Sequence, residues 1–259
     1  MMRTIIDHVG RAIKVPDEPK RIISICPAIT GTLFEIGLNV EVVGRTRFCI
    51  FPKKIVDQVA IVGGTKEINI DAIRALKPDL IIAEKEENTK EIVAQLEKEF
   101  PVFVFEIQSI EESKRMVLDL GKLVCRVREA ENLVCKIEAV FEDLPNLQGK
   151  KAAYMIWRKP QMVVGNHTYI NAVLEAMNLV NPFTVFEGRY PVITPEALQD
   201  AKLDYLFLAT EPFRFQAKHV KEFADKLPDV QVSLIDGEMF WYGEKMIEGA
   251  AYLKGKFGG

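Results

Sequence analysis

The chain contains one short unit twice, first as Asp71-Ala72-Ile73-Arg74-Ala75-Leu76-Lys77-Pro78-Asp79-Leu80-Ile81-Ile82 and again as Glu196-Ala197-Leu198-Gln199-Asp200-Ala201-Lys202-Leu203-Asp204-Tyr205-Leu206-Phe207. The copies align without a gap. Each has an acidic first residue followed by alanine, and a Lys-x-Asp sequence before an apolar run. This order predicts an acidic helix start, a short helix, a turn and a buried strand. A repeat of this kind indicates two related lobes.

Short apolar runs alternate with helical patterns along the whole chain. The runs are Ile22–Cys26, Val42–Thr46, Leu80–Ala83, Val102–Ile107, Ala152–Trp157, Met162–Val164, Tyr205–Ala209 and Val232–Ile235. Strands interleaved with helices are typical of βαβ units, and almost wholly apolar strands are covered on both faces of a sheet. The pattern therefore predicts an α/β fold with two Rossmann-like lobes and mainly parallel central sheets.

A long helical pattern separates the two copies of the repeat. Ser109-Ile110-Glu111-Glu112 has the form of a capping box, and apolar residues then recur at helical spacing until Pro145. A helix from Glu111 to about Asp143 would be roughly 50 Å long. We therefore predict one long backbone helix over 111–144 that joins lobes at 1–110 and 145–259. Two consecutive helices with a break near Gly121 are the alternative.

Composition and motifs argue against several classes of protein. The net charge of −3 leaves no basic excess for binding nucleic acid. The sequence has no GxGxxG after a strand, no P-loop, no HExxH and no GxSxG. Its three histidines and four cysteines have no metal-ligand spacing. We expect a protein that is not an enzyme and has no metal site or intrinsic cofactor of its own.

Several short motifs occur in a characteristic order. They are Asp7-His8-Val9-Gly10-Arg11, Arg21-Ile22-Ile23-Ser24-Ile25-Cys26-Pro27, Val62-Gly63-Gly64-Thr65, Asn69-Ile70-Asp71 and Asp236-Gly237-Glu238-Met239-Phe240-Trp241-Tyr242-Gly243. In this order the chain resembles the helical-backbone metal-chelate receptors, the substrate-binding proteins of ABC importers. The resemblance implies a monomer that binds a small-molecule metal chelate between its lobes and delivers it to an ABC permease and its ATPase. The ligand expected first is cobalamin, and second a ferric siderophore or haem.

The N-terminal sequence bears on where the protein works. The stretch that begins Met1-Met2-Arg3 has a charge but no apolar region, so no signal peptide is expected in this numbering. The resemblance implies a periplasmic or membrane-associated protein, whereas the missing signal leaves a cytoplasmic location open. The alternative function is therefore a signal-less cytoplasmic cofactor carrier, sensor or small enzyme on the same fold.

The loops that follow the predicted strands contain many aromatic and arginine residues. Ligands of open α/β sheets bind at the carboxyl ends of the strands. Rings and guanidinium groups suit a flat macrocycle with anionic arms. The candidate ligand-contacting residues are Arg47, Phe48, Thr65, Trp157, Arg158, His167, Arg189, Tyr190, Trp241 and Tyr242. For His167, the alternative to contact with the chelated metal is a turn residue that caps the following helix.

Asp71 and Glu196 open the two copies of the repeat. The resemblance implies that these carboxylates dock the two lobes onto arginines of the permease. Charge pairs of this kind set the register of a complex and steer its formation. The alternative is an acidic residue placed at a helix N-terminus because it complements the helix dipole.

Overall fold

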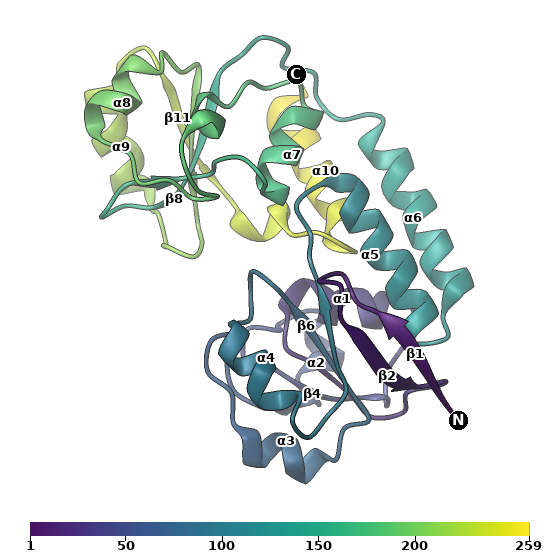
Figure 1. The fold of residues 1–259 in the computed structure, drawn as a ribbon. Helices are drawn as coiled ribbons and strands as arrows, with labels where there is room; N and C mark the ends of the chain where they lie inside the picture. Colours follow the sequence, from purple (N-terminus) through teal and green to yellow (C-terminus); the bar gives the residue numbers. More distant parts are fainter. Residues whose placement is uncertain (259) are drawn as a thin grey trace. The chain divides into compact units, whose positions relative to one another are not determined.

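The chain divides into two units in the computed structural model, which describes residues 1–258 (Figure 1). Unit 1 consists of Met1–Ile107 together with Glu111–Ile137. Unit 2 consists of Gln108–Ile110 and the chain from Glu138 onward. Each unit has its own sheet, so the predicted α/β fold with two sheet-containing lobes is confirmed.

The sheet of unit 1 is wholly parallel. Its order is β5 (Ala60–Ile61), β4 (Val42–Arg45), β3 (Ile22–Ser24), β6 (Leu80–Glu84) and β7 (Val102–Phe105). The helices between these strands are α1 (Pro27–Glu35), α2 (Lys53–Val56), α3 (Ile70–Leu76) and α4 (Lys90–Leu96). Ile23, Ile81 and Val104 on the strands are buried together with Ile73 of α3 and Ile92 of α4. Burial on both faces explains why these strands are nearly all apolar.

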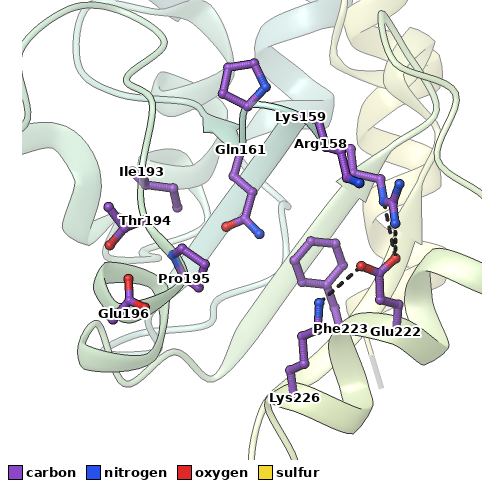
Figure 2. Close-up of a pocket in the computed structure, with 11 residues that line it drawn as sticks. Arg158, Lys159, Gln161, Ile193, Thr194, Pro195, Glu196, Glu222, Phe223 and Lys226 are labelled. Carbon is purple, nitrogen blue, oxygen red and sulfur yellow. Dashed lines mark hydrogen bonds and ion pairs between the residues drawn. The ribbon is translucent and has the colours of Figure 1, made fainter.

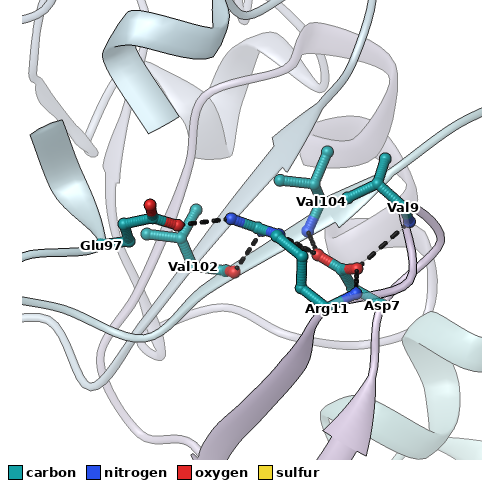
Figure 3. A network of polar contacts seen from close by, with 6 residues as sticks. All are labelled: Asp7, Val9, Arg11, Glu97, Val102 and Val104. Atoms are coloured by element: carbon teal, nitrogen blue, oxygen red, sulfur yellow. Dashed lines mark hydrogen bonds and ion pairs between the residues drawn. The ribbon is translucent and has the colours of Figure 1, made fainter. Parts of the chain in front are cut away.

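An antiparallel hairpin precedes this sheet, formed by β1 (Met2–Ile6) and β2 (Ala12–Pro16). Its turn contains a buried ion pair (Figure 3). The Asp7 carboxylate, with 0% of the side chain exposed, accepts hydrogen bonds from the Arg11 guanidinium at 2.7 and 2.9 Å. Arg11 also donates to Glu97 and to the Val102 carbonyl, 2.6 and 3.0 Å away. The Asp7-to-Arg11 motif therefore ties the hairpin to the edge strand β7.

The sheet of unit 2 is mostly parallel. Its order is β11 (Gln231–Ile235), β10 (Tyr205–Ala209), β8 (Ala152–Trp157) and β9 (Met162–Val163), and only β9 is antiparallel to its neighbour. The helices are α7 (Tyr169–Ala176), α8 (Pro195–Asp200), α9 (Ala217–Lys226) and α10 (Lys245–Phe257), with 3₁₀ turns η1 (Pro182–Val185) and η2 (Gly237–Phe240). Phe183, Leu206 and Phe223 are part of its core.

Both copies of the repeat form the predicted helix, turn and strand. α3 leads to β6, and α8 leads to β10. Asn69 caps α3 by accepting from Ala72 N at 3.0 Å, and Thr194 caps α8 by accepting from Ala197 N at 3.1 Å. Side-chain oxygens at these positions satisfy amides that a helix start leaves without a partner.

The turns of the two copies are also alike. Lys77 and Lys202 both have a left-handed backbone, with φ of 48°. The following aspartates then anchor the neighbouring strands. Asp79 accepts from the backbone amide of Arg21 at 2.9 Å, just before β3, and Asp204 accepts from that of Lys151 at 2.8 Å, just before β8. The Lys-x-Asp sequence thus fixes the start of the strand that lies beside each repeat.

The predicted single helix over 111–144 is wrong. The segment forms two helices, α5 (Ile110–Leu123) and α6 (Val127–Phe141), which lie side by side in Figure 1. Cys125 between them has φ of 58°, a left-handed conformation that ends a helix. Gly121 packs so closely against Ala130 that it leaves no room for a Cβ. The break near Gly121 therefore reflects helix–helix packing, and the length argument for a single connecting helix fails.

A membrane-spanning helix needs about 20 mainly apolar residues. Between residues 1 and 258, no helix combines sufficient length with sufficient apolar character to cross a membrane.

Candidate ligand-contacting and docking surfaces

In unit 1, a buried arginine shapes the loop that follows β4. Arg45 is 6% exposed. Its guanidinium donates to the carbonyls of Thr46, Cys49 and Val56, at 3.2, 3.1 and 2.8 Å. Because these carbonyls lie at successive points of the loop, Arg45 holds the loop in one conformation. The loop is thus fixed at the carboxyl end of β4, where ligands of α/β sheets bind.

Arg47 and Phe48 in the same loop face solvent. Arg47 lies over the ring of Phe48, with Cζ 5.0 Å from the ring centroid, and Phe48 is 48% exposed. The loop at Gly64 passes close beneath them, since a Cβ there would lie 3.1 Å from both Arg47 Nη2 and Phe48 Cε2. Thr65 in that loop is 7% exposed. The structure therefore brings Arg47, Phe48 and the loop containing Thr65 together, with the cation and ring at the surface.

A buried acid lies at the carboxyl end of β6. Glu84 is 2% exposed and accepts hydrogen bonds from the amides of Glu86 and Glu87, at 2.8 and 2.9 Å. Burial raises its pKa to about 8, since desolvation outweighs the two amide donors. Asn88 links this turn to neighbouring strand ends by donating to the carbonyls of Ile25 and Thr65, both at 3.0 Å. The turn is thus rigid and can carry a proton near neutral pH.

In unit 2, three predicted aromatic residues have fixed partners. Trp157 at the end of β8 is 38% exposed, donates to the Lys159 carbonyl at 3.1 Å and meets Phe213 edge-on at 5.7 Å. Trp241 donates to the Glu211 carboxylate at 2.5 Å. Tyr242 meets Tyr169 edge-on at 5.8 Å. All three are held in place, and Trp157 presents the most clearly exposed ring.

The other predicted residues of unit 2 lie in different surroundings. His167 is exposed, with φ of 57°, in a turn just before Thr168, and Thr168 itself caps α7. Arg189 and Tyr190 are half-buried. The Arg189 carbonyl accepts from Gly165 N at 2.8 Å, which ties their loop to the loop that contains His167.

Arg158 does not share the surroundings of its neighbour Trp157. Its guanidinium donates to Glu222 of α9, at 2.7 and 3.2 Å, and lines a pocket of about 500 Å³ (Figure 2). The hydrogen bond from Arg158 holds the pKa of Glu222 below its usual value. The pocket also includes Glu196, one of the two predicted docking residues.

The two predicted docking carboxylates differ in their partners. Asp71 is strongly exposed but pairs with Arg74, the Nη1–Oδ1 distance being 2.9 Å. Arg74 is itself bound by Glu99. Glu196 is exposed and forms no ion pair with any residue of the described chain. Of these two carboxylates, Glu196 is the one without a cationic side-chain partner among residues 1–258.

Metal-binding groups do not cluster in the described part of the chain. Across residues 1–258, no group of three His, Cys, Asp or Glu side chains could hold a metal ion. All four cysteines are free thiols, with Cys26 and Cys49 buried and Cys125 and Cys135 exposed.

Sequence reasoning missed three polar residues of these surfaces: Gln161, Glu211 and Glu222. Glu84 was expected in a loop at the sheet edge, and the structure makes it the buried last residue of β6. Glu211 accepts a hydrogen bond from Trp241, and Glu222 accepts one from Arg158, in each case from a residue far away in the sequence. Gln161 belongs to no motif. No local pattern predicts such long-range partners.

The sequence matches a known protein family over most of its length. Residues 22–229 match the model of a family described as "Periplasmic binding protein". This chain belongs to the periplasmic binding protein family. Its resemblance to substrate-binding proteins is thereby confirmed.

Individual members of the periplasmic binding protein family are distant from this chain. It is similar to an uncharacterised ABC transporter substrate-binding lipoprotein, YvrC of Bacillus subtilis, with 24% identity over 193 residues, which cover 69% of this chain and 60% of that protein. It is also similar to a cobalamin-binding protein of Halobacterium salinarum, with 23% identity over 176 residues, 66% of this chain and 48% of that one. The chain thus spans about half to 60% of these relatives' lengths.

A solved structure matches over nearly the full chain. The petrobactin-binding protein YclQ of Bacillus subtilis has a TM-score of 0.82 and 18% identity, and the match covers 99% of both chains. At this identity the match shows the fold alone.

Proposed function

We propose that this protein captures a small-molecule metal chelate and delivers it to an ABC permease with its ATPase. The family supports capture and delivery in place of catalysis. The observation that carries the ligand class is the exposed Arg47–Phe48 pair, where a cation lies 5.0 Å from a half-exposed ring at a strand's carboxyl end. A conjugated macrocycle can stack on such a ring, and its anionic arms can bind the guanidinium.

Unit 2 offers a second surface of the same character. Trp157 and Phe213 form an edge-on pair near the carboxyl end of β8. We propose contacts to the chelate from the predicted residues of both units, namely Arg47, Phe48, Thr65, Trp157, His167, Arg189, Tyr190, Trp241 and Tyr242. We include Arg158 as well, through its guanidinium, which the Glu222 carboxylate holds at 2.7 Å.

Among chelates we rank cobalamin first and a ferric siderophore or haem second. A cobalamin-binding protein is among the relatives, and a petrobactin-binding protein shares the fold. Titration of the purified protein with cyanocobalamin, hemin and a ferric hydroxamate, followed by absorbance and calorimetry, tests the ranking. At least one should bind more tightly than about 100 μM, equivalent to about −5.5 kcal/mol. Weaker binding of all three would overturn the chelate assignment.

We also propose that Asp71 and Glu196 dock the two units onto basic residues of the permease. Both carboxylates are exposed at equivalent positions of the repeated unit, which supports a shared role. Docking should weaken when either charge is reversed, while chelate affinity stays unchanged, because neither residue belongs to the proposed ligand-contacting set. Equal loss of both would contradict the docking role.

The place of action follows from the same proposal. The family is described as periplasmic, and YvrC is named a lipoprotein, which supports action outside the cytoplasmic membrane. We propose that the protein acts there as a monomer. Fractionation of the producing cells, with light scattering of the purified protein, tests this. Recovery in the cytoplasm would favour an intracellular carrier instead.

A further inference from the structure

Asn88 joins the turn after β6 to the loop of unit 1 that contains Thr65. This side chain is 3% exposed, and its carbonyl oxygen accepts from the Glu84 amide at 2.9 Å. Its amide nitrogen donates to the Thr65 carbonyl and to the Ile25 carbonyl just after β3, both at 3.0 Å. The backbone at Thr65 is therefore held by the same turn that contains the buried Glu84.

The loop held by Asn88 lies directly beneath the exposed Arg47–Phe48 pair. The Arg47 amide donates to the Gly63 carbonyl at 2.8 Å, so the two loops are joined through their backbones. At Gly64, a Cβ would come within 3.1 Å of both the Arg47 and the Phe48 side chains. A shift of the loop at Thr65 would therefore move the surface on which the Arg47–Phe48 pair rests.

The turn after β6 is closed by a buried carboxyl group. Oε2 of Glu84 accepts from the amides of Glu86 and Glu87, at 2.8 and 2.9 Å. Among residues 1–258, no basic side chain forms an ion pair with Glu84. The charged groups around this turn are Glu86, Glu87, Lys66 of the neighbouring loop and the Lys85–Glu106 ion pair.

The charge of this turn depends on the protonation of Glu84. Burial raises the pKa of Glu84 to about 8 against the two amide donors, and the carboxylates of Glu86 and Glu87 raise it further. Burial also raises the pKa of Glu87, although Lys66 opposes this rise. An ionised Glu84 adds a buried negative charge beside like charges, which is unfavourable until water reaches it. Ionisation therefore favours opening of the turn.

We propose that Glu84 is a proton switch that positions the ligand-contacting loop of unit 1. With Glu84 protonated, the turn stays closed and Asn88 holds the Thr65 loop beneath Arg47 and Phe48. With Glu84 ionised, the proton passes to solvent water, the turn loosens and the loop loses its fixed position. Glu84 is a positioning residue, because it acts through Asn88. This inference rests on the proposed capture function and adds regulation of the same site by pH.

Unit 2 has no equivalent switch. In the alignment of the two copies, Ala209 corresponds to Glu84, and Phe213 corresponds to Asn88. Neither the buried acid nor the amide that would transmit its state is present there. Loop movement with this pH dependence should therefore be confined to unit 1, and unit 2 serves as an internal reference.

The switch can be tested without a ligand. In ¹H–¹³C spectra of the full chain, the Thr65 methyl group and the Phe48 ring should shift together with a midpoint near pH 8. The methyl group of Thr168, buried in unit 2, should not follow them. Glu84→Gln keeps an acceptor for the turn amides and should abolish the shared shift. Glu87→Gln is the control from the same turn and should keep the shift with a lower midpoint, because it removes a like charge. Independent midpoints for Thr65 and Phe48, or an unchanged shift in Glu84→Gln, would overturn the proposal.

The consequence for capture is measured with cyanocobalamin, hemin or the ferric hydroxamate, whichever binds in the titrations above. The parent should bind about tenfold more tightly at about pH 6.5 than at about pH 9, because binding and protonation of Glu84 favour the same loop position. Glu84→Gln should bind equally at both pH values. Equal affinity of the parent at both, or the parent's pH dependence retained in Glu84→Gln, would contradict the switch. If none of the three binds, the capture function fails, and the ligand-free titration decides the switch by itself.

Discussion

The two copies of the repeated unit share a framework and differ in the chemistry at its ends. Both begin with a capped helix, which is followed by a lysine with a left-handed backbone conformation. In both, an aspartate then anchors the neighbouring strand. Toward the end of the helix, however, Arg74 of the first copy corresponds to Gln199 of the second. At the end of the strand, the buried Glu84 corresponds to Ala209. The capping, turn and anchoring positions that build the fold are retained, whereas a position on the helix surface and a buried position at the strand end have diverged.

The edge strand β7 of unit 1 offers the largest expected effect on stability. It pairs with β6 of the first copy, and the buried Asp7–Arg11 pair ties it to the hairpin. Asp7→Ala should lower the free energy of unfolding by about 3 kcal/mol, because it leaves Arg11 without its buried partner. Chemical denaturation measures the loss, and hydrogen exchange should place it in β7 and not in β10 or β11. Asp225→Ala, an exposed control on α9, should change stability by about 0.5 kcal/mol or less. A uniform loss of protection in both units would contradict this account.

Charge reversal at the two docking positions should give unequal effects. Glu196→Arg should weaken binding to the permease by about thirtyfold or more, and Asp71→Arg by about fivefold or less, because Arg74 already neutralises Asp71. Surface plasmon resonance on the reconstituted transporter measures both. The swap Gln199→Arg sharpens the comparison, because it gives the second copy the cation of the first and should weaken docking in the same direction. Equal effects of the two reversals would rule out an asymmetric interface.

The ends of β6 and β10 should contribute differently to the pH dependence of stability, because Glu84 can titrate and the corresponding Ala209 cannot. The folded-state pKa of Glu84 is raised from 4.5 to about 8, so the folded protein holds a proton that the unfolded chain has lost. This contribution to stability is complete below pH 4.5 and is lost as pH rises through 8. Glu84→Gln should therefore flatten the decline and stabilise the protein at pH 8 by on the order of 2 kcal/mol. Denaturation from pH 5 to 9 measures it, and an unchanged slope in the variant would contradict the assignment to Glu84.

The smallest expected effect on stability concerns the turn lysines and should be the same in both copies of the repeat. Lys77 and Lys202 have the same left-handed backbone, with φ of 48°. Glycine tolerates this conformation better than lysine, so Lys77→Gly and Lys202→Gly should each raise stability by about 0.5–1 kcal/mol. Thermal unfolding of the two variants measures the gain. A gain in one copy and a loss in the other would show that the turns are less alike than their geometry indicates.

The sequence predicts the strands and the repeat well because both are local. Strands buried on both faces require uninterrupted apolar runs, and the runs at Leu80–Ala83 and Tyr205–Ala209 became β6 and β10. The single-helix prediction missed the break because it occurs at Cys125, whose left-handed backbone conformation is usually adopted by glycine. The apolar spacing continues across the break, so periodicity alone could not detect it.

The candidate site was less predictable because its contacts join distant parts of the chain. Trp157 and Arg158 are adjacent and were predicted to act together, but they point to different neighbours, Phe213 and Glu222. The pocket beside Glu196 combines residues from the turn between β8 and β9, from the start of α8 and from α9. No local spacing brings Gln161 to that pocket, and only the folded chain shows that its oxygen has no donor.

Chelate capture is tested most directly by the emission of one tryptophan. The chain has two tryptophans, so Trp241→Phe leaves Trp157, which is 38% exposed at the end of β8. The account predicts that cyanocobalamin, or else hemin or a ferric hydroxamate, quenches this emission saturably with one ligand per chain. The added substitution Phe48→Ala should weaken that binding by about tenfold, since it removes a stacking surface. Emission that none of the three ligands quenches saturably, in a protein that remains folded, would contradict the account.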